Sequence, residues 1–118
     1  MSINRRIKNK RINKVLIEIK QELKKLYGNK LVDLILYGSY ARGEENQESD
    51  IDIALILKGQ IRPYEEIKRV LKIACNLDLK YNVVLDIHPI SDDFYKSKEF
   101  SFYSTIQEEG ISIWVNQK

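Results

Sequence analysis

Two aspartates, Asp50 and Asp52, stand at the start of an apolar run that ends at Leu57. A run of this length, rich in Ile and Leu and bounded by polar residues, is typical of a β-strand. Alternation along a strand places Asp50, Asp52, Ala54 and Ile56 on one face and the intervening Ile and Leu side chains on the other. Residues two apart on a strand lie about 6.5 Å apart, so both carboxylates can serve one site.

Two carboxylates held this close need a counterion. Their charges repel each other, and burial at the head of a strand raises the pKa of both groups further. A bound divalent cation relieves both effects, and a small set of oxygen ligands shared with phosphates suits Mg²⁺ better than zinc. The alternative is that Asp50 and Asp52 only mark a solvated strand end. We favour the metal site.

Gly38 and Ser39 directly follow an earlier apolar run, residues 31–37, which also has the character of a strand. Gly38 permits a sharp turn and a close approach of the backbone to a ligand. Ser39 is a good N-cap for a one-turn helix over residues 40–42, and Gly43 ends that helix. The free N–H groups of a helix N-terminus favour phosphate. A phosphate cradle beside a metal-binding pair indicates phosphoryl or nucleotidyl transfer.

Arg42 follows Ser39 by one turn of this short helix. Its planar guanidinium can meet either a phosphate or a carboxylate at that position, and we expect a phosphate contact. The polar insert over residues 43–49 carries three glutamates, which we expect to belong to a solvated loop rather than to the metal site.

These residues carry a family resemblance. Gly38 and Ser39, ten further residues, and then Asp50-Ile51-Asp52 resemble the GS-x10-DxD signature of the polymerase β-like nucleotidyltransferase superfamily. The short chain looks most like the minimal nucleotidyltransferases, which are antitoxins paired with HEPN-domain ribonucleases. That family has a third carboxylate on a later strand, and Asp86 lies in the matching context. The resemblance therefore implies Mg²⁺ held by the three aspartates and a nucleotide bound at Gly38, Ser39 and Arg42.

The function implied by the resemblance is transfer of AMP from ATP to a tyrosine hydroxyl of a HEPN ribonuclease toxin, which silences the toxin. Superfamily members that act alone usually add a second domain to hold the acceptor, so we expect this chain to receive its acceptor on a partner. One alternative is an antitoxin that neutralises its toxin by binding alone. Another is a free-standing transferase that acts on an antibiotic or an RNA end.

Asp86 interrupts a further apolar run, and residues 81–88 predict a strand that Pro89 closes. If this strand lies beside the one that begins at Asp50, three carboxylates meet at one edge of the sheet. His88 shares the face of Asp86, and we interpret it as a bystander at the exit of the strand rather than as a nucleotide contact.

Residues 4–27 predict a long amphipathic helix that ends at Gly28. Residues 1–30 contain ten Lys or Arg and two Glu, a net charge of +8, whereas residues 31–118 contain ten and fifteen, a net charge of −5. We favour an ordinary solvated helix face, because few aromatic residues interleave with the charges, and we do not expect direct nucleic-acid binding. Contact with an acidic patch on a partner stays open as another use.

The remaining elements complete an α/β architecture that resembles the palm-like core of the superfamily, a mixed sheet with helices packed against it. A helix is predicted to begin near Pro63. Cys75 lies beside the apolar stripe of this helix, and we interpret it as a small core residue rather than a nucleophile. A helix over residues 97–109 ends at Gly110, and a short strand covers 111–115. The aromatic residues of this tail are candidates for the core and for a protein interface in equal measure.

Length and composition fit one minimal nucleotidyltransferase domain over residues 1–118, with the basic helix at 4–27, the catalytic core at 31–90 and the C-terminal helix and strand at 97–115. Hydrophobic residues make up 43% and charged residues 31% of the chain, as in ordinary globular proteins. We find no apolar stretch that approaches the length of a membrane helix, about 18 residues. A single cysteine excludes an internal disulfide, so we expect a cytoplasmic protein.

Overall fold

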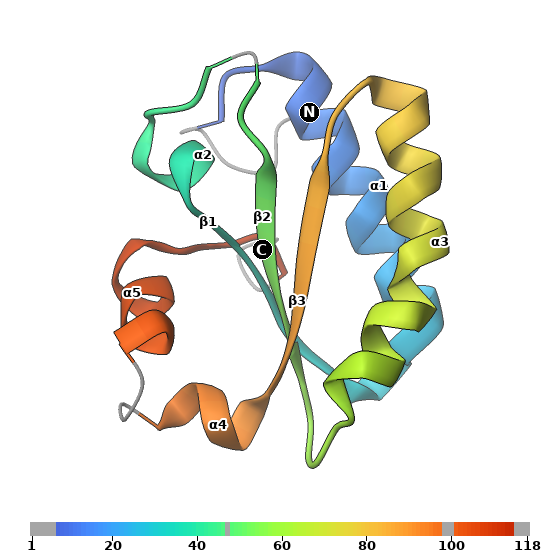
Figure 1. Ribbon diagram of the computed structural model, residues 1–118, viewed down its shortest axis with the longest axis vertical. Helices are drawn as coiled ribbons and strands as arrows, with labels where there is room; N and C mark the ends of the chain where they lie inside the picture. The colour runs from blue at the N-terminus through green and yellow to red at the C-terminus, as the bar shows by residue number, and fades with distance from the viewer. Residues whose placement is uncertain (1–6, 47, 98–100, 115–118) are drawn as a thin grey trace.

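The computed structural model (Figure 1) describes residues 7–46, 48–97 and 101–114. A four-stranded sheet forms its centre, in the order β3-β2-β1-β4. The strands are β1 (Leu31–Tyr37), β2 (Ile51–Leu57), β3 (Leu85–Ser91) and β4 (Ile111–Ser112). β1 is antiparallel to both β2 and β4, whereas β3 runs parallel to β2. The α/β class and the mixed sheet are confirmed.

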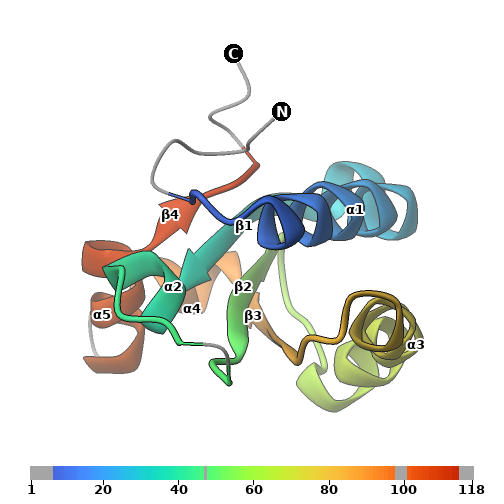
Figure 2. The same ribbon diagram turned by 90° about the horizontal axis from the view of Figure 1, so that it is seen from above.

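Helices cover both faces of this sheet, as Figure 2 shows. One face carries the two long helices, α1 (Lys10–Tyr27) and α3 (Pro63–Tyr81). The other face carries α4 (Asp92–Lys96) and α5 (Ser101–Glu109). A one-turn helix, α2 (Ser39–Arg42), follows β1, and a short 3-10 helix, η1 (Gly28–Lys30), joins α1 to β1. The two layers of helices leave one end of the sheet to α2 and to the loop before β2.

The alternation predicted for the second apolar run is confirmed. The odd-numbered residues of β2 enter the larger core, which contains the buried residues of α1 and α3. Ala54 and Ile56 face the opposite way and pack in a smaller core with Ile106 of α5. Asp52 therefore points to the α5 side of the sheet. The sheet thus separates its catalytic candidates from its main core.

Leu55 tests how much the central strand contributes to stability. Its side chain is completely buried, so Leu55→Ala leaves a cavity in the larger core. We expect the free energy of unfolding in urea to fall by about 2–5 kcal/mol. Leu79→Ala makes the same chemical change at a residue that is 86% exposed and should shift stability by less than about 0.5 kcal/mol. Equal losses in the two variants would contradict this packing.

A buried hydrogen bond joins the two long helices. The hydroxyl of Tyr27 at the end of α1 donates to Oε1 of Glu66 in α3 over 2.8 Å. Only 4% of Glu66 is exposed, and Arg69 lies 3.5 Å from the same carboxylate oxygen. Burial, followed by the hydrogen bond to Glu66, raises the pKa of Tyr27, so this hydroxyl remains a donor at neutral pH. The buried carboxylate is thereby satisfied within the helical layer.

The first helix begins later than predicted. Asn9 caps α1 at Lys10, because its side-chain Oδ1 accepts from the N–H groups of Arg11 and Ile12 over 2.9 and 3.2 Å. Residues 7 and 8 precede this cap and are not helical, and residues 4–6 lie outside the described part of the chain. The start was predicted too early because the apolar pattern extends back to Ile7, which is buried but not helical. The predicted end near Tyr27 is confirmed.

The third strand differs from the prediction at both ends. It spans Leu85–Ser91, so it begins four residues later than the predicted 81 and continues through Pro89 instead of ending there. β3 is an edge strand, paired only with β2. Proline lacks an N–H group, but an edge strand tolerates it because its outer side has no partner to bond.

The C-terminal part holds two helices rather than one. α4 ends at Lys96, and Ser97 is extended with φ −70° and ψ 133°, so Ser97 does not belong to the helix predicted over 97–109, of which α5 covers Ser101–Glu109. Residues 98–100 and 115 of the predicted elements lie outside the described residues. Phe94 and Phe102 are exposed, whereas Tyr95 and Tyr103 pack against the smaller core. The prediction for Cys75 was wrong, because its side chain is exposed.

The length and apolar character of a helix decide whether it can span a lipid bilayer. None of the helices within residues 7–46, 48–97 and 101–114 combines the length and the apolar character needed to span one.

Candidate active site

Strand register places two of the predicted carboxylates side by side. Asp52 of β2 pairs with Tyr37 of β1 on one side and with Asp86 of β3 on the other. Asp50 immediately precedes β2, and the N–H group of Ile51 donates to the carbonyl of Val84 over 2.8 Å. This bond joins the segment that carries Asp50 to the one that leads into Asp86. The three predicted acids therefore lie at one end of the sheet.

The charges at this end are not balanced. Burial raises the pKa of Asp52, and the negative charges of Asp86 and then Asp50 raise it further. Interactions with His88 and Arg42 lower the pKa of Asp52 but do not cancel the rise. A protein that gathers like charges without neutralising them stores a repulsion that a cation relieves. The electrostatics of Asp52 are those expected of a cation ligand.

The donor chemistry at this end suits a hard divalent ion. Asp50, Asp52 and Asp86 offer carboxylate oxygens alone, which are the ligands that Mg²⁺ prefers. Across the described ranges, no three His, Cys, Asp or Glu side chains are already gathered tightly enough to hold a metal. Asp50 and Asp86 are exposed, so their side chains are free to turn toward Asp52. The residues fit Mg²⁺ by chemistry and by strand position.

Gly38 is packed directly against Asp52. Its backbone has φ +74° and ψ −152°, a conformation that a residue with a side chain rarely adopts. A Cβ atom at this position would collide with Oδ2 of Asp52 and would lie 3.2 Å from its Cγ. Only glycine lets the end of β1 approach the carboxylate so closely. The turn and the acid are thus parts of one arrangement.

The predicted capping role of Ser39 was wrong. Gly38 is the N-cap of α2, and its carbonyl accepts from the N–H groups of Ala41 and Arg42 over 3.0 and 3.1 Å. Ser39 is the first residue of the helix instead, because the unusual backbone of Gly38 turns the chain into the helix one residue earlier. The roles of Gly38 and Ser39 in nucleotide binding stay predictions.

Arg42 is held by carboxylates in this structure. Its Nε atom bonds Oε1 of Glu44 over 2.7 Å, and Nη1 lies 3.2 Å from Oε2 of Glu109 in α5. The side chain is 40% exposed, so these pairs are weak enough to exchange for another anion. Arg42 also opposes the rise in the pKa of Asp52. Its predicted contact with phosphate stays a prediction.

Sequence reasoning missed a group of three aromatic rings beside the acids. The hydroxyl of Tyr37 and Nδ1 of His88 are joined by a hydrogen bond of 2.6 Å, which crosses the face of β2 near the small side chain of Ala54. The ring of Phe102 lies edge-on to both, with centroids 5.8 Å from Tyr37 and 5.9 Å from His88. His88 is therefore bonded into the site and is not a bystander. One feature of the sequence could have revealed this group. Alternation along the strands places Tyr37 and His88 on the same face of the sheet as Asp52 and Asp86.

The chain is similar to known proteins in sequence. A family model described as "Nucleotidyltransferase domain" matches residues 16–113. Two relatives from Methanocaldococcus jannaschii are both named "Putative protein adenylyltransferase". One is 31% identical over 102 residues, covering 86% of this chain and 98% of the relative. The other is 35% identical over 98 residues, covering 82% and 92%.

Solved structures share the fold. A crystal structure described as a toxin–antitoxin with AMP-PNP is 25% identical, covers 85% of this chain and 74% of its own, and has a TM-score of 0.58. A nucleotidyltransferase structure from Sulfolobus solfataricus is 17% identical, covers 98% and 92%, and has a TM-score of 0.61. The chain belongs to the nucleotidyltransferase domain family. Its structural neighbours include two structures described as toxin–antitoxin complexes.

Proposed function

We propose that this chain is an Mg²⁺-dependent antitoxin that transfers AMP from ATP to a tyrosine hydroxyl of a HEPN ribonuclease toxin. The observation that carries the proposal is the pairing of Asp52 with Asp86 beside Gly38, which combines a carboxylate site with a close backbone turn. Names of the relatives support protein adenylylation. The toxin–antitoxin neighbour with AMP-PNP supports both the partner and the nucleotide.

Each element of the site has a separate task in this reaction. The triphosphate of ATP lies over Gly38 and Ser39, at the start of α2. Asp50, Asp52 and Asp86 hold Mg²⁺, which supplies positive charge against the charge that develops on the phosphate oxygens. Arg42 exchanges its carboxylate partners for a phosphate.

The order of the strands sets the direction of attack. The phosphate cradle follows β1, whereas Asp86 lies on the far side of β2, on the edge strand. Attacking and leaving oxygens are roughly in line in phosphoryl transfer, so the acceptor hydroxyl arrives from the β3 side. The exposed carboxylate of Asp86 takes the phenolic proton. The phenolic oxygen then bonds the α-phosphorus, the bond to the β-phosphate oxygen breaks, and pyrophosphate leaves.

Labelled ATP tests this proposal. The chain is incubated with Mg²⁺ and ATP labelled at the α- or the γ-phosphate, with and without the product of the neighbouring gene. We expect the α-label on the neighbour's tyrosine and no γ-label, because pyrophosphate departs. Asp93→Asn, which alters an exposed aspartate of α4, is the matched control and should transfer label normally.

Other results would replace the proposal. Tight binding to the partner with neither label would identify an antitoxin that acts by binding alone. The α-label on RNA or on a small molecule, with none on the partner, would identify a free-standing transferase. The γ-label on the partner would identify phosphoryl transfer instead of adenylyl transfer.

A further inference from the structure

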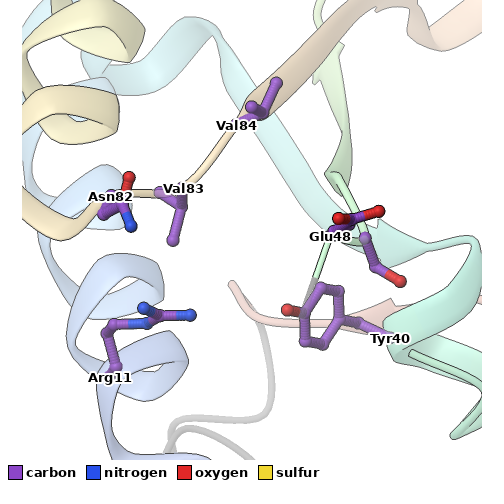
Figure 3. Close-up of a pocket in the computed structure, with 7 residues that line it drawn as sticks. Arg11, Tyr40, Glu48, Asn82, Val83 and Val84 are labelled. Carbon is purple, nitrogen blue, oxygen red and sulfur yellow. The ribbon is translucent and has the colours of Figure 1, made fainter. Parts of the chain in front are cut away.

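A small pocket lies at the catalytic end of the sheet, on the side that α1 and α3 cover (Figure 3). Its volume is about 110 Å³, and Arg11, Tyr40 and Asn82 provide its polar side chains together with a glutamate and a serine of the loop before β2. Asp50, Asp52 and Asp86 do not line it. The pocket is therefore separate from the proposed metal site.

Tyr40 is buried but leaves its hydroxyl facing this pocket. Only 7% of the residue is exposed, and among the described residues no hydrogen-bond partner meets its hydroxyl. Burial raises the pKa of Tyr40 and the charge of Arg11 opposes the rise, so the group remains a donor at neutral pH. The hydroxyl is open to the pocket and is not sealed from solvent, so it can donate to a bound ligand that has an acceptor oxygen.

Arg11 faces Tyr40 across the pocket. Figure 3 shows its guanidinium directed toward the Tyr40 hydroxyl, with Asn82 beside it. Within the part of the chain that the structure describes, Arg11 forms no ion pair. Glu48, the acidic residue of the lining, lies on the opposite side of the pocket from Arg11 in this view. Arg11 also stands in the first turn of α1, where the helix dipole is positive.

The walls of the pocket come from the same segments that carry the catalytic candidates. Tyr40 directly follows Ser39, and Ser49 directly precedes Asp50. Val84 stands two residues before Asp86, and its carbonyl accepts from the N–H of Ile51. A group bound here contacts all three segments at once.

We propose that this pocket binds a phosphate group through the Arg11 guanidinium, the Tyr40 hydroxyl and the Asn82 amide. An Arg fork and neutral donors are the usual partners of phosphate oxygens. Sites for drug-sized molecules occupy about 300–1,000 Å³, so this pocket admits a phosphate but not the nucleoside attached to one. The bound group braces the segments that deliver Ser39, Asp50 and Asp86. The site is independent of the transfer reaction proposed above.

Inorganic phosphate is the first probe, followed by NMR of the full chain. We expect saturable shifts of the Arg11 side-chain Nε–H and of the Asn82 amide at millimolar phosphate. Arg11→Gln removes a charged hydrogen bond and should weaken binding at least about 10-fold. Tyr40→Phe removes one neutral hydrogen bond and should weaken binding about 2–10-fold. Retained circular dichroism establishes that both variants are folded.

Lys14→Gln is the matched control, because it removes the same charge from an exposed position of α1 that does not line the pocket. Its affinity for phosphate should stay within about twofold of the unaltered chain. Loss of affinity equal to that of Arg11→Gln would show a diffuse electrostatic effect and overturn the site. Unchanged affinity in Arg11→Gln, or the absence of saturation at about 50 mM phosphate, would overturn it as well.

The source of the phosphate group is found with two further probes. AMP or a 5′-phosphorylated oligonucleotide that shifts the same resonances more tightly than inorganic phosphate would assign the site to a nucleotide phosphate. Shifts with inorganic phosphate alone would assign it to the free anion. Both results retain the three-residue site.

Discussion

Asp52→Asn is expected to remove most of the adenylyl transfer while the fold persists. The carboxylate lies between Tyr37 and Asp86 in the strand register and is the innermost of the three acids. Its replacement removes a charge that would hold the cation in the proposed site, and losses of single electrostatic groups at such centres reach about 10³-fold. We expect kcat/KM in the labelled ATP assay to fall by at least that factor. The Asp50→Asn/Asp52→Asn double variant should lose transfer completely.

Although Asp52→Asn lowers activity, we expect it to raise the free energy of unfolding. The folded-state pKa of Asp52 is raised, so its protonated form stabilises the fold at pH values below about 3.9, the ordinary value of an Asp carboxyl. That contribution is lost as the pH rises through the folded-state pKa. Asn does not titrate, so the variant gains stability relative to the unaltered chain between about pH 4 and pH 7.

Urea unfolding without divalent metal at the two pH values measures this gain. The same titration on Asp93→Asn provides the baseline, because this aspartate is exposed in α4. A relative stability that falls toward pH 7 would contradict the repulsion inferred at the site. Transfer by a well-folded Asp50→Asn/Asp52→Asn protein would contradict the catalytic assignment itself.

Gly38→Ala is expected to damage both the fold and the reaction. The new Cβ meets Oδ2 of Asp52, and the residue must also hold a φ of +74° with a ψ of −152°. Strain of this kind costs about 1–3 kcal/mol, and we expect the free energy of unfolding to fall by that amount. The carboxylate must also move, so transfer should fall at least about 10²-fold.

Gly43→Ala separates the two effects. Gly43 also has a positive φ, +73°, but a Cβ there meets nothing within 4 Å. This variant should lose stability through left-handed strain alone, about 1–2 kcal/mol, and should keep most of its transfer activity. Equal activity in the two variants would show that the approach of Gly38 to Asp52 has no catalytic role.

The sequence was most informative where residues with a functional or conformational role also mark the start or end of a strand or helix. The strand at 31–37 was predicted to the residue, and the end of the next strand at Leu57 was predicted too, because Gly38 and the paired aspartates mark the functional ends of these strands. Pro63 marked the start of α3 in the same way. The face of Asp52 followed from the period of two along a strand.

Other features depend on contacts between distant segments. Pairing of Asp52 with Asp86 requires β3 to lie beside β2. No local sequence pattern predicts that neighbourhood. The hydrogen bond between Tyr37 and His88 arises only after the sheet has brought β1 and β3 to either side of β2. α4 was not predicted, and Ser97 was wrongly placed in a helix because it is compatible with both helix and extended chain. Tertiary packing decides such positions.

Pro89 has a consequence for how the protein associates. Exposed edge strands invite another chain to extend the sheet through backbone hydrogen bonds, and proline on an edge blocks such strand addition. Pro89 stands in the middle of β3, and at the other edge β4 has only the two residues Ile111 and Ser112. Neither edge offers a continuous row of backbone donors and acceptors. Within the described residues, both edges of the sheet therefore disfavour strand addition, whether by a partner or by another copy of the chain.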